Sequence, residues 1–301
     1  MKQAAAFAPG HITGFFQICD APEDPVLKGS RGSGASIVQG VYTRIRAEPS
    51  DDALHTIRIN GKSTRGAYVS ENVLQKFLCN LNEPYRIEVE HTVETPIGAG
   101  FGSSGGGALT LALSLNEALG AGLSRLEAAR IAHVAEIECK TGLGTVFASL
   151  TGGFGVLVKP GGPGVGQAIK YEHSRELSLV YIHFGPVETS MALSDPAIRK
   201  RINELGGVFV DRLRLDQRPD LFMELAREFT DHVGLATRRL RAVFEATDKA
   251  KVPCAMAMFG EVAFSLVEKE CAEEVTKIFE SAGQGREAVI VGVDEEAARL
   301  I

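Results

Sequence analysis

The segment from Pro96 to Ala108 has the composition and spacing of a phosphate-binding loop. It reads PIGAGFGSSGGGA and leads into a strongly apolar run. Its glycines allow positive φ and close approach of the backbone to an anion. A helix beginning near Ser103 would turn its free N–H groups and its positive dipole end to the same point. The hydroxyls of Ser103 and Ser104 could hold phosphate oxygens or a phosphate-bound metal ion, whereas an ordinary turn with a serine N-cap would need far fewer glycines.

Two common kinds of phosphate loop do not fit this segment. A Walker A loop needs Lys-Ser or Lys-Thr after its last glycine, but Gly105 is followed by two more glycines. The span 100–105 matches G-x-G-x-x-G, yet a dinucleotide fold requires a continuously apolar strand before it and an acid at the end of a second strand. The preceding stretch Arg86–Glu94 alternates apolar and polar residues, and a capping box at Ser124–Glu127 predicts a further helix instead of that second strand.

A third kind of loop does fit. The pattern P-x-G-x-G-x-G-S-S-x-x-x-A resembles the second signature motif of the GHMP kinases, the superfamily of galactokinase, homoserine kinase, mevalonate kinase and phosphomevalonate kinase. Residues 8–16, APGHITGFF, look like the first motif, which lines the acceptor side of the family's cleft. Ala135-Glu136, ahead of glycines in 142–144 and 152–153, resembles the metal-binding helix and the turn after it.

The third motif of the family departs from its usual pattern. Residues 255–261, AMAMFGE, stand in its place but lack the Gly-rich run. Together with His11–Gly14 and the triple glycine 105–107, they are similar to the archaeal branch that phosphorylates pantoate on the route to coenzyme A. The resemblance implies ATP-dependent phosphorylation of the primary hydroxyl of (R)-pantoate to 4-phosphopantoate, by direct transfer with Mg²⁺. A homoserine, mevalonate or other small-alcohol kinase, and a noncatalytic GHMP-fold binding protein, stay open as alternatives.

The resemblance, together with the residue types, assigns roles to individual residues. It gives the metal to Ser104 and Glu136, with Glu138 as the fallback, although two residues along a helix turn a side chain about 200° away. His11 and Thr145 join Ser104 and Glu136 as catalytic positions. The ATP-binding positions are Pro96, Gly98, Gly100, Gly102, Ser103, Ser104, Gly105 and Gly106, and the substrate-binding positions are His11, Thr13, Gly14, Arg31 and Ser33.

Three of these positions carry open questions. Thr145 stands where many members of the family have the aspartate that accepts the acceptor's proton, but a loose, metaphosphate-like transition state needs little activation of the nucleophile. His11 stands where the first motif often has lysine, and its imidazole could polarise the γ-phosphate or touch the acceptor, with a structural turn histidine as the alternative. We predict that Arg31, in the glycine-rich loop 29–34, binds the acceptor's carboxylate, with a solvated loop arginine as the alternative. His133 is interpreted as a structural or surface histidine.

The elements that must position these residues are predicted to be both strands and helices. Strands with period-two alternation are predicted at 41–46, 55–59 and 86–94, with a turn at Asn60-Gly61. The helix through 109–119 is apolar almost all round, so we expect it to be buried with only its N-terminus at the cleft. Further strands are predicted at 154–158, 177–184, 254–258 and 287–293, with amphipathic helices between the later ones. The first strand-like segment is expected to be interrupted at Pro9 and Gly10.

The resemblance implies an α+β, GHMP-kinase-like fold with the active site in the cleft between two domains. The N-terminal domain, residues 1–160, would be like ribosomal protein S5 domain 2 and would carry the phosphate loop. The C-terminal domain, residues 161–301, would be ferredoxin-like. We place the boundary at the turn Pro160–Gly164, where proline and glycine are concentrated.

The composition excludes several other classes of protein. A chain of 301 residues with 45% hydrophobic content can bury the core of two packed domains. A net charge of −6 argues against nonspecific binding of nucleic acid, and no apolar run approaches the roughly 18 residues of a membrane span. The five cysteines lack C-x-x-C spacing, which favours reduced thiols over zinc or disulfides. We expect a cytoplasmic homodimer whose ligands are pantoate and ATP.

Overall fold

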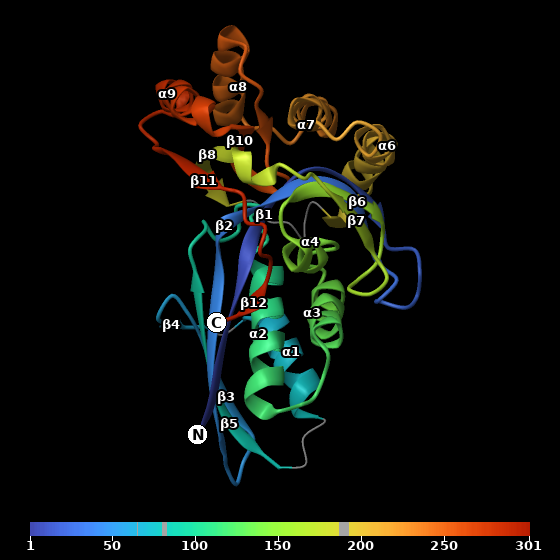
Figure 1. Ribbon diagram of the computed structural model, residues 1–301, viewed down its shortest axis with the longest axis vertical. Helices are drawn as coiled ribbons and strands as arrows, with labels where there is room; N and C mark the ends of the chain where they lie inside the picture. The colour runs from blue at the N-terminus through green and yellow to red at the C-terminus, as the bar shows by residue number, and fades with distance from the viewer. Residues whose placement is uncertain (65, 80–82, 187–192) are drawn as a thin grey trace.

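The computed structural model describes residues 1–64, 66–79, 83–186 and 193–301, and it arranges the strands in two sheets (Figure 1). The strands are β1 Lys2–Cys19, β2 Gly29–Pro49, β3 Leu54–Ile59, β4 Lys62–Ser63, β5 Tyr85–Val93, β6 Phe154–Lys159, β7 Gln167–Lys170, β8 Leu177–Pro186, β9 Ala255–Met256, β10 Gly260–Glu268, β11 Ala288–Gly292 and β12 Arg299–Leu300. The α-helices are α1 Tyr68–Leu78, α2 Ser103–Leu119, α3 Arg125–Cys139, α4 Thr145–Thr151, α6 Pro196–Leu213, α7 Pro219–Val233, α8 Arg238–Ala250 and α9 Ala272–Ala282. Within the described ranges, no helix has both the length and the apolar character needed to cross a bilayer.

The larger sheet is built on the long antiparallel ribbon of β1 and β2. Its order is β12-β1-β2-β5-β3-β4, and β6 pairs with β2 and carries β7 at its outer edge. The interruption that we predicted at Pro9 and Gly10 is wrong. Pro9 pairs with Gly40 and Gly10 pairs with Ile37, so the extra residues of the irregularity, 38 and 39, lie in β2 and β1 continues for 18 residues.

The segment 29–34 is a strand and not the loop that we predicted. It begins β2 and pairs with β1 on one side, while residues 32–35 pair with β6 on the other. A Cβ on Gly34 would lie 2.1 Å from the carbonyl oxygen of Ile12, and one on Gly32 would lie 2.7 Å from that of Phe15. The glycines are therefore needed for the close approach of neighbouring backbones.

The predictions for the other strands are largely confirmed. The alternating segments 41–46, 55–59 and 86–94 fall in β2, β3 and β5, and the later ones coincide with β6, β8 and β11. Of the segment 254–258, only Ala255–Met256 is a strand, β9. Alternating and continuous apolar patterns thus located the strands, although they could not give the sheet order.

Helices α1, α2 and α3 cover one face of the larger sheet (Figure 1). Residues 105–115 of α2 are all buried, as its all-round apolar sequence predicts. The helix ends at Gly120, whose φ of 66° suits a glycine C-cap. The predicted capping box then starts α3, because Ser124 accepts from the Glu127 N–H and the Glu127 carboxylate accepts from the Ser124 N–H.

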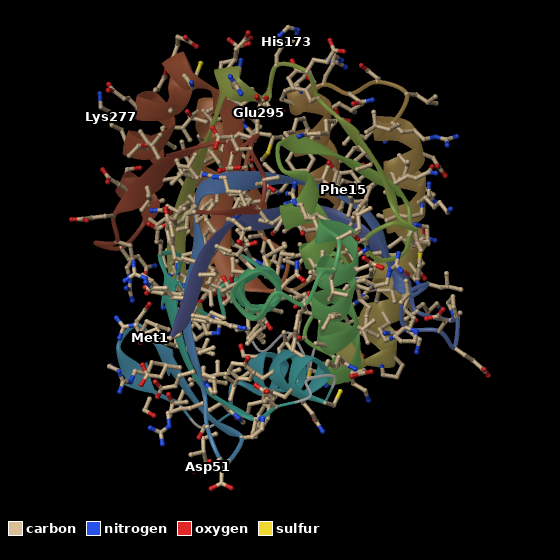
Figure 2. The ribbon with its side chains drawn as sticks, turned by 60° about the horizontal axis from the view of Figure 1, so that its bottom comes forward. Met1, Phe15, Asp51, His173, Lys277 and Glu295 are labelled. Atoms are coloured by element: carbon tan, nitrogen blue, oxygen red, sulfur yellow. The ribbon has the colours of Figure 1, made fainter. Side chains whose placement is uncertain are left out.

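The smaller sheet has the order β11-β8-β10-β9 and lies with α6 to α9 at the other end of the molecule (Figure 1). The distal part of β1 joins this half. Phe15 is fully buried, and its ring centroid lies 5.7 Å from that of Phe209 and 5.9 Å from that of Phe222. Figure 2 shows Phe15 well inside the molecule.

The two halves share strands across the boundary that we predicted at residue 160. The core around α6 to α9 includes Ile12 and Ile37 from β1 and β2, while a second core lies between the larger sheet and α1 to α3. Strands β7 and β12 follow residue 160 in the chain but belong to the larger sheet. The division into 1–160 and 161–301 stays a prediction, and the ribbon of β1 and β2 serves both cores.

Candidate active site

The loop before α2 has the backbone conformation that anion binding requires. Gly98, Gly100 and Gly102 have φ values of 73°, 82° and 67°. Gly102 is the N-cap of α2, and among the described residues no side chain caps that helix end. The first N–H groups of a helix lack acceptors within it, so these groups and the helix dipole are available to an anion.

The other predicted loop positions divide into exposed and packed groups. Ser104 is exposed and Ser103 is half-buried in the first turn of α2, and half-buried Pro96 stands at the start of the loop. Gly106 faces the sheet instead, because a Cβ there would lie 3.1 Å from Cγ2 of Val41. The two serines therefore lie in the same first turn as the free N–H groups, and Gly106 allows the helix to pack against β2.

Glu136 brings a buried carboxylate to the first turn of α2. It is 2% exposed, and its Oε2 lies 2.7 Å from the positions that a Cβ would take on Gly105 and on Gly142. Among the described residues, its hydrogen-bond donor is the Thr141 hydroxyl, at 3.5 Å. Burial raises the pKa of Glu136 to about 7. A buried carboxylate with one weak donor is suited to a cation.

Glu138 points away from this site, as the helix geometry predicts. Its carboxylate accepts hydrogen bonds from Lys76 Nζ at 3.1 Å and from Asn72 Nδ2 at 3.0 Å, both on α1. Its side chain is 42% exposed. Glu138 thus holds α3 to α1, and Glu136 is the acid that faces the loop.

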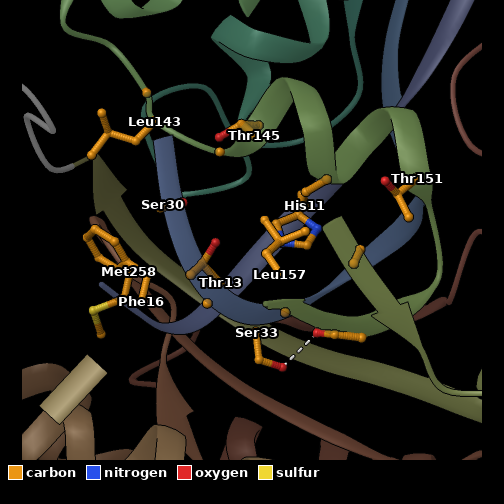
Figure 3. A pocket seen from close by; sticks show the side chains of 18 of the residues that line it. His11, Thr13, Phe16, Ser30, Ser33, Leu143, Thr145, Thr151, Leu157 and Met258 are labelled. Carbon is orange, nitrogen blue, oxygen red and sulfur yellow. Dashed lines mark hydrogen bonds between the residues drawn. The ribbon is translucent and has the colours of Figure 1, made fainter. Parts of the chain in front are cut away.

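A cavity lies beside the loop, and Figure 3 shows His11, Thr13 and Thr145 around it. Six of the predicted site residues line it, namely His11, Thr13, Ser33, Gly100, Gly102 and Thr145. The Ser33 hydroxyl donates to the carbonyl of Gly155 at 2.8 Å, which joins β2 to β6 at the cavity wall. The structure thus brings the first motif, the phosphate loop and the start of α4 to one place.

His11 is a neutral group in this cavity. Its Nδ1 lies 3.3 Å from the hydroxyl oxygen of Ser36, and burial lowers its pKa to about 4. Its backbone N–H donates to the carbonyl of Phe101 at 2.9 Å. His11 therefore ties β1 to the phosphate loop and presents an uncharged imidazole at neutral pH.

Thr145 begins α4 directly beside the phosphate loop. A Cβ on Gly102 would lie 2.3 Å from Cγ2 of Thr145, and the positive φ of Gly102 independently disfavours a side chain at that position. The contact brings the N-terminus of α4 to that of α2. Thr145 thus supplies a hydroxyl side chain, and no carboxylate, at this edge of the cavity.

The turn after β9 closes the loop from the other side. Phe259 takes a positive φ of 60°, and the backbone N–H of Met258 donates to the carbonyl of Thr13 at 3.0 Å. A Cβ on Gly260 would lie 1.9 Å from the carbonyl oxygen of Ala99. The departure from the usual third motif therefore retains the one glycine that lets this turn pack on the phosphate loop.

Gly14 and Arg31 are not among the residues that line the cavity. A Cβ on Gly14 would lie 2.7 Å from the Phe222 ring, so Gly14 serves the packing of β1 on α7. Arg31 is held by three hydrogen bonds: Nε donates to the carbonyl of Val158 at 2.9 Å, Nη1 to Gln17 at 3.2 Å and Nη2 to Asp211 at 2.5 Å. Arg31 therefore links β2 to β6 and α6. Its assignment to the acceptor's carboxylate stays a prediction, which these contacts disfavour.

Similarity to known proteins extends over nearly the whole chain. Residues 67–153 match the GHMP kinases N terminal domain. A pantoate kinase of Thermococcus kodakarensis is 33% identical over 282 residues, which cover 91% of this chain and 90% of the relative. One of Methanocaldococcus jannaschii is 31% identical over 275 residues, covering 91% and 97%. This chain belongs to the pantoate kinase family of the GHMP kinases.

A solved structure supports the same grouping of this GHMP kinase. It is described as a phosphotransferase related to the coenzyme A biosynthesis pathway, and it is 30% identical with a TM-score of 0.89 over 99% of this chain and 98% of its own. The α+β GHMP-kinase fold predicted from the motifs is confirmed. The similarity also covers the C-terminal half, which the N-terminal domain match does not reach.

Several residues lining the cavity of this GHMP kinase escaped the sequence analysis. They are Ser30 on β2, Thr151 at the end of α4 and Lys170 on β7. Ser30 lies in the glycine-rich segment 29–34 but was not itself predicted, whereas Thr151 and Lys170 lie in no motif. Lys170 reaches the cavity because β7 pairs with β6. His133 is structural, as one of our two interpretations held, because it is buried with Nε2 3.0 Å from the carbonyl of Lys28. The five cysteines are all free thiols.

Proposed function

We propose that this GHMP kinase transfers the γ-phosphoryl group of ATP to the primary hydroxyl of (R)-pantoate and forms 4-phosphopantoate for coenzyme A synthesis. The observation that carries the proposal is the similarity to pantoate kinases over about nine tenths of the chain. The cavity between the first motif, the phosphate loop and the turn at 258–260 supports it, because an acceptor there would lie next to bound phosphate.

The phosphate groups of ATP would bind at the N-terminus of α2. Gly98, Gly100 and Gly102 give the loop a backbone that can lie against an anion. The free N–H groups of the first turn and the hydroxyls of Ser103 and Ser104 would donate to phosphate oxygens. Phosphoryl transfer requires mainly positioning and charge stabilisation from the protein, and this loop is suited to both tasks.

Ser104 and Glu136 would hold Mg²⁺. The fit rests on the buried Glu136 carboxylate, whose pKa is raised and which has one long hydrogen bond. Oxygen ligands suit a hard cation. Within the described residues no cluster of three or more His, Cys, Asp or Glu could hold a metal, so further ligands would come from ATP and water. When bound, the ion would neutralise charge that develops on the phosphate oxygens.

Positioning, more than proton abstraction, would activate the acceptor. The described residues that line the cavity include no Asp or Glu, and burial keeps the pKa of His11 far below neutrality. Thr13, Thr145 and the neutral His11 could hydrogen-bond the hydroxyl and direct it at the phosphorus. A loose transition state places little demand on a general base.

We expect pantoate to be the preferred acceptor, with homoserine and mevalonate as poor substrates. The enzyme would be assayed with ATP and Mg²⁺, and kcat/KM would be compared for the three acceptors. Equal or better turnover of homoserine would exclude pantoate as the specific substrate while leaving a kinase. No transfer to any hydroxy acid would favour a noncatalytic GHMP-fold binding protein. The cytoplasmic location and the homodimer stay predictions, and sedimentation would test the dimer.

Replacing Arg31 by alanine is expected to lower stability without changing the KM for pantoate. The substitution removes hydrogen bonds to Val158 and Gln17 and an ion pair with the half-exposed Asp211. A loss of about 1–2 kcal/mol in the free energy of unfolding is the expected scale. Urea unfolding and initial rates would measure the two effects. A raised KM for pantoate with unaltered stability would return the carboxylate to Arg31.

A further inference from the structure

Pantoate carries a carboxylate, and a binding site for it requires a positive partner or a set of N–H donors. Arg31 is engaged elsewhere, and His11 is neutral. Among the described residues that line the cavity, Lys170 is the one with a charged side chain at neutral pH. We propose that Lys170 binds the carboxylate of the acceptor and so selects hydroxy acids over neutral alcohols. This inference rests on the proposed function.

The hairpin of β6 and β7 carries Lys170 to the cavity. Lys170 pairs with Gly155, and Gly155 also pairs with Gly34 of β2 on its other side. A Cβ on Gly155 would lie 2.4 Å from the carbonyl oxygen of Ile169, so only glycine allows β7 to lie this close. Since β2 is paired directly with the first motif on β1, this register brings β7 to the acceptor side of the site.

The stem of Lys170 passes over Gly153 at the cavity wall. A Cβ on Gly153 would lie 2.9 Å from Cε of Lys170, and Gly153 has a positive φ of 76°. Gly152 and Gly153 line the same cavity. The glycine pair that resembles a family motif therefore also makes room for a long side chain from β7.

The ammonium group of Lys170 has N–H donors available for a ligand. Nζ donates to the carbonyl oxygen of Thr151 at 2.9 Å, at the C-terminal end of α4. An ammonium has three N–H donors, so two remain for a ligand. Lys170 is exposed, which means that its charge remains hydrated and that binding requires little rearrangement. The contact with Thr151 fixes the direction of the side chain at the edge of the cavity.

A purely structural role would be to neutralise the C-terminal end of α4. A cation there bonds a carbonyl that lacks a partner within the helix and interacts favourably with the helix dipole. Loss of such a role would lower the melting temperature but would not change which acceptors the enzyme prefers. The two roles are therefore separated by acceptor preference and not by activity alone.

The test compares Lys170→Met, Lys170→Arg and the control Lys159→Met. Lys159 is an exposed lysine at the end of β6 that does not line the cavity. Initial rates would be measured with pantoate and with its neutral primary amide at saturating ATP and Mg²⁺. The ratio of kcat/KM for acid over amide does not depend on the active fraction of a preparation, so partial misfolding cannot produce the result.

We expect Lys170→Met to raise the KM for pantoate about 10- to 100-fold, because a charge-assisted hydrogen bond is lost. The preference for acid over amide should fall by the same factor, Lys170→Arg should recover part of it, and the KM for ATP should not change. Lys159→Met should match the wild type. If Lys170→Met keeps the wild-type preference for acid over amide, the assignment of the carboxylate to Lys170 is overturned. The proposed function would still stand in that case, provided that the wild type phosphorylates pantoate. A wild type that does not phosphorylate pantoate overturns both.

Discussion

Replacing Glu136 by glutamine is expected to raise the Mg²⁺ concentration needed for half-maximal activity by about 10- to 100-fold. Glutamine keeps the size of the side chain but removes the negative charge that a hard cation requires. Glu136 is 2% exposed between Gly105 and Gly142, and the Thr141 hydroxyl is the hydrogen-bond donor to its carboxylate within the described part of the chain. Activity would be titrated against Mg²⁺ at fixed ATP, with free Mg²⁺ calculated at each point.

Glu138→Gln is the matched control, because it makes the same chemical change two residues along α3. Glu138 pairs with Lys76 and Asn72 on α1, so its loss should leave the Mg²⁺ requirement unchanged. In the folded, metal-free protein the pKa of Glu136 is raised to about 7. The free energy of unfolding therefore falls as the pH rises from the pKa of this group in the unfolded chain to that value. Glu136→Gln should therefore keep or raise the melting temperature without metal. The reverse order of Mg²⁺ sensitivity would move the metal to Glu138.

The phosphate loop could be predicted from the sequence because its determinants are local. Gly98, Gly100 and Gly102 supply positive φ within one short segment, and Ser103 begins the helix that follows. The faces of α3 could likewise be predicted, since the separation of Glu136 from Glu138 follows from helix geometry alone. Where a backbone conformation or a helix face depends on residues that are neighbours in the sequence, composition and spacing are sufficient to predict it.

The segment 29–34 was mispredicted because a glycine that permits a turn and a glycine that permits close packing look the same locally. Gly32 and Gly34 touch backbone atoms of β1, which the chain reaches only through the pairing of two long strands. The partner of Arg31 is Asp211, 180 residues away. No local pattern predicts that contact, so an arginine fixed between elements looked like a free one.

Lys170, in contrast, lines the cavity although no sequence pattern around it predicts this position. Nothing in the sequence around it resembles a motif, and its place at the cavity depends on the register of β6 and β7 and on the glycines at 153 and 155. The glycines themselves were visible, but the side chain that they make room for was not. Tertiary pairing therefore brings Lys170 to the cavity, whereas the glycine loop before α2 is formed by residues that are neighbours in the sequence.

Replacing Ser104 by alanine is expected to lower kcat about 100-fold or more while leaving stability unchanged. One hydroxyl that contacts phosphate or metal in the transition state is worth roughly 2–4 kcal/mol. Ser104 is exposed at the first turn of α2, and alanine is at least as favourable as serine within a helix, so folding should not suffer. Steady-state rates and thermal unfolding would be measured on the same preparation.

Ser124→Ala is the comparison variant, in which stability and not kcat is expected to fall. Ser124 caps α3 through the Glu127 N–H, far from the phosphate loop in the sequence, and loss of an N-cap costs about 1 kcal/mol of stability. This variant should therefore unfold more easily and keep the wild-type kcat. If Ser104→Ala instead kept both kcat and ATP affinity, the hydroxyl would have no part in transfer. The backbone N–H groups of the first turn of α2 and the hydroxyl of Ser103 would then be the donors at this helix end.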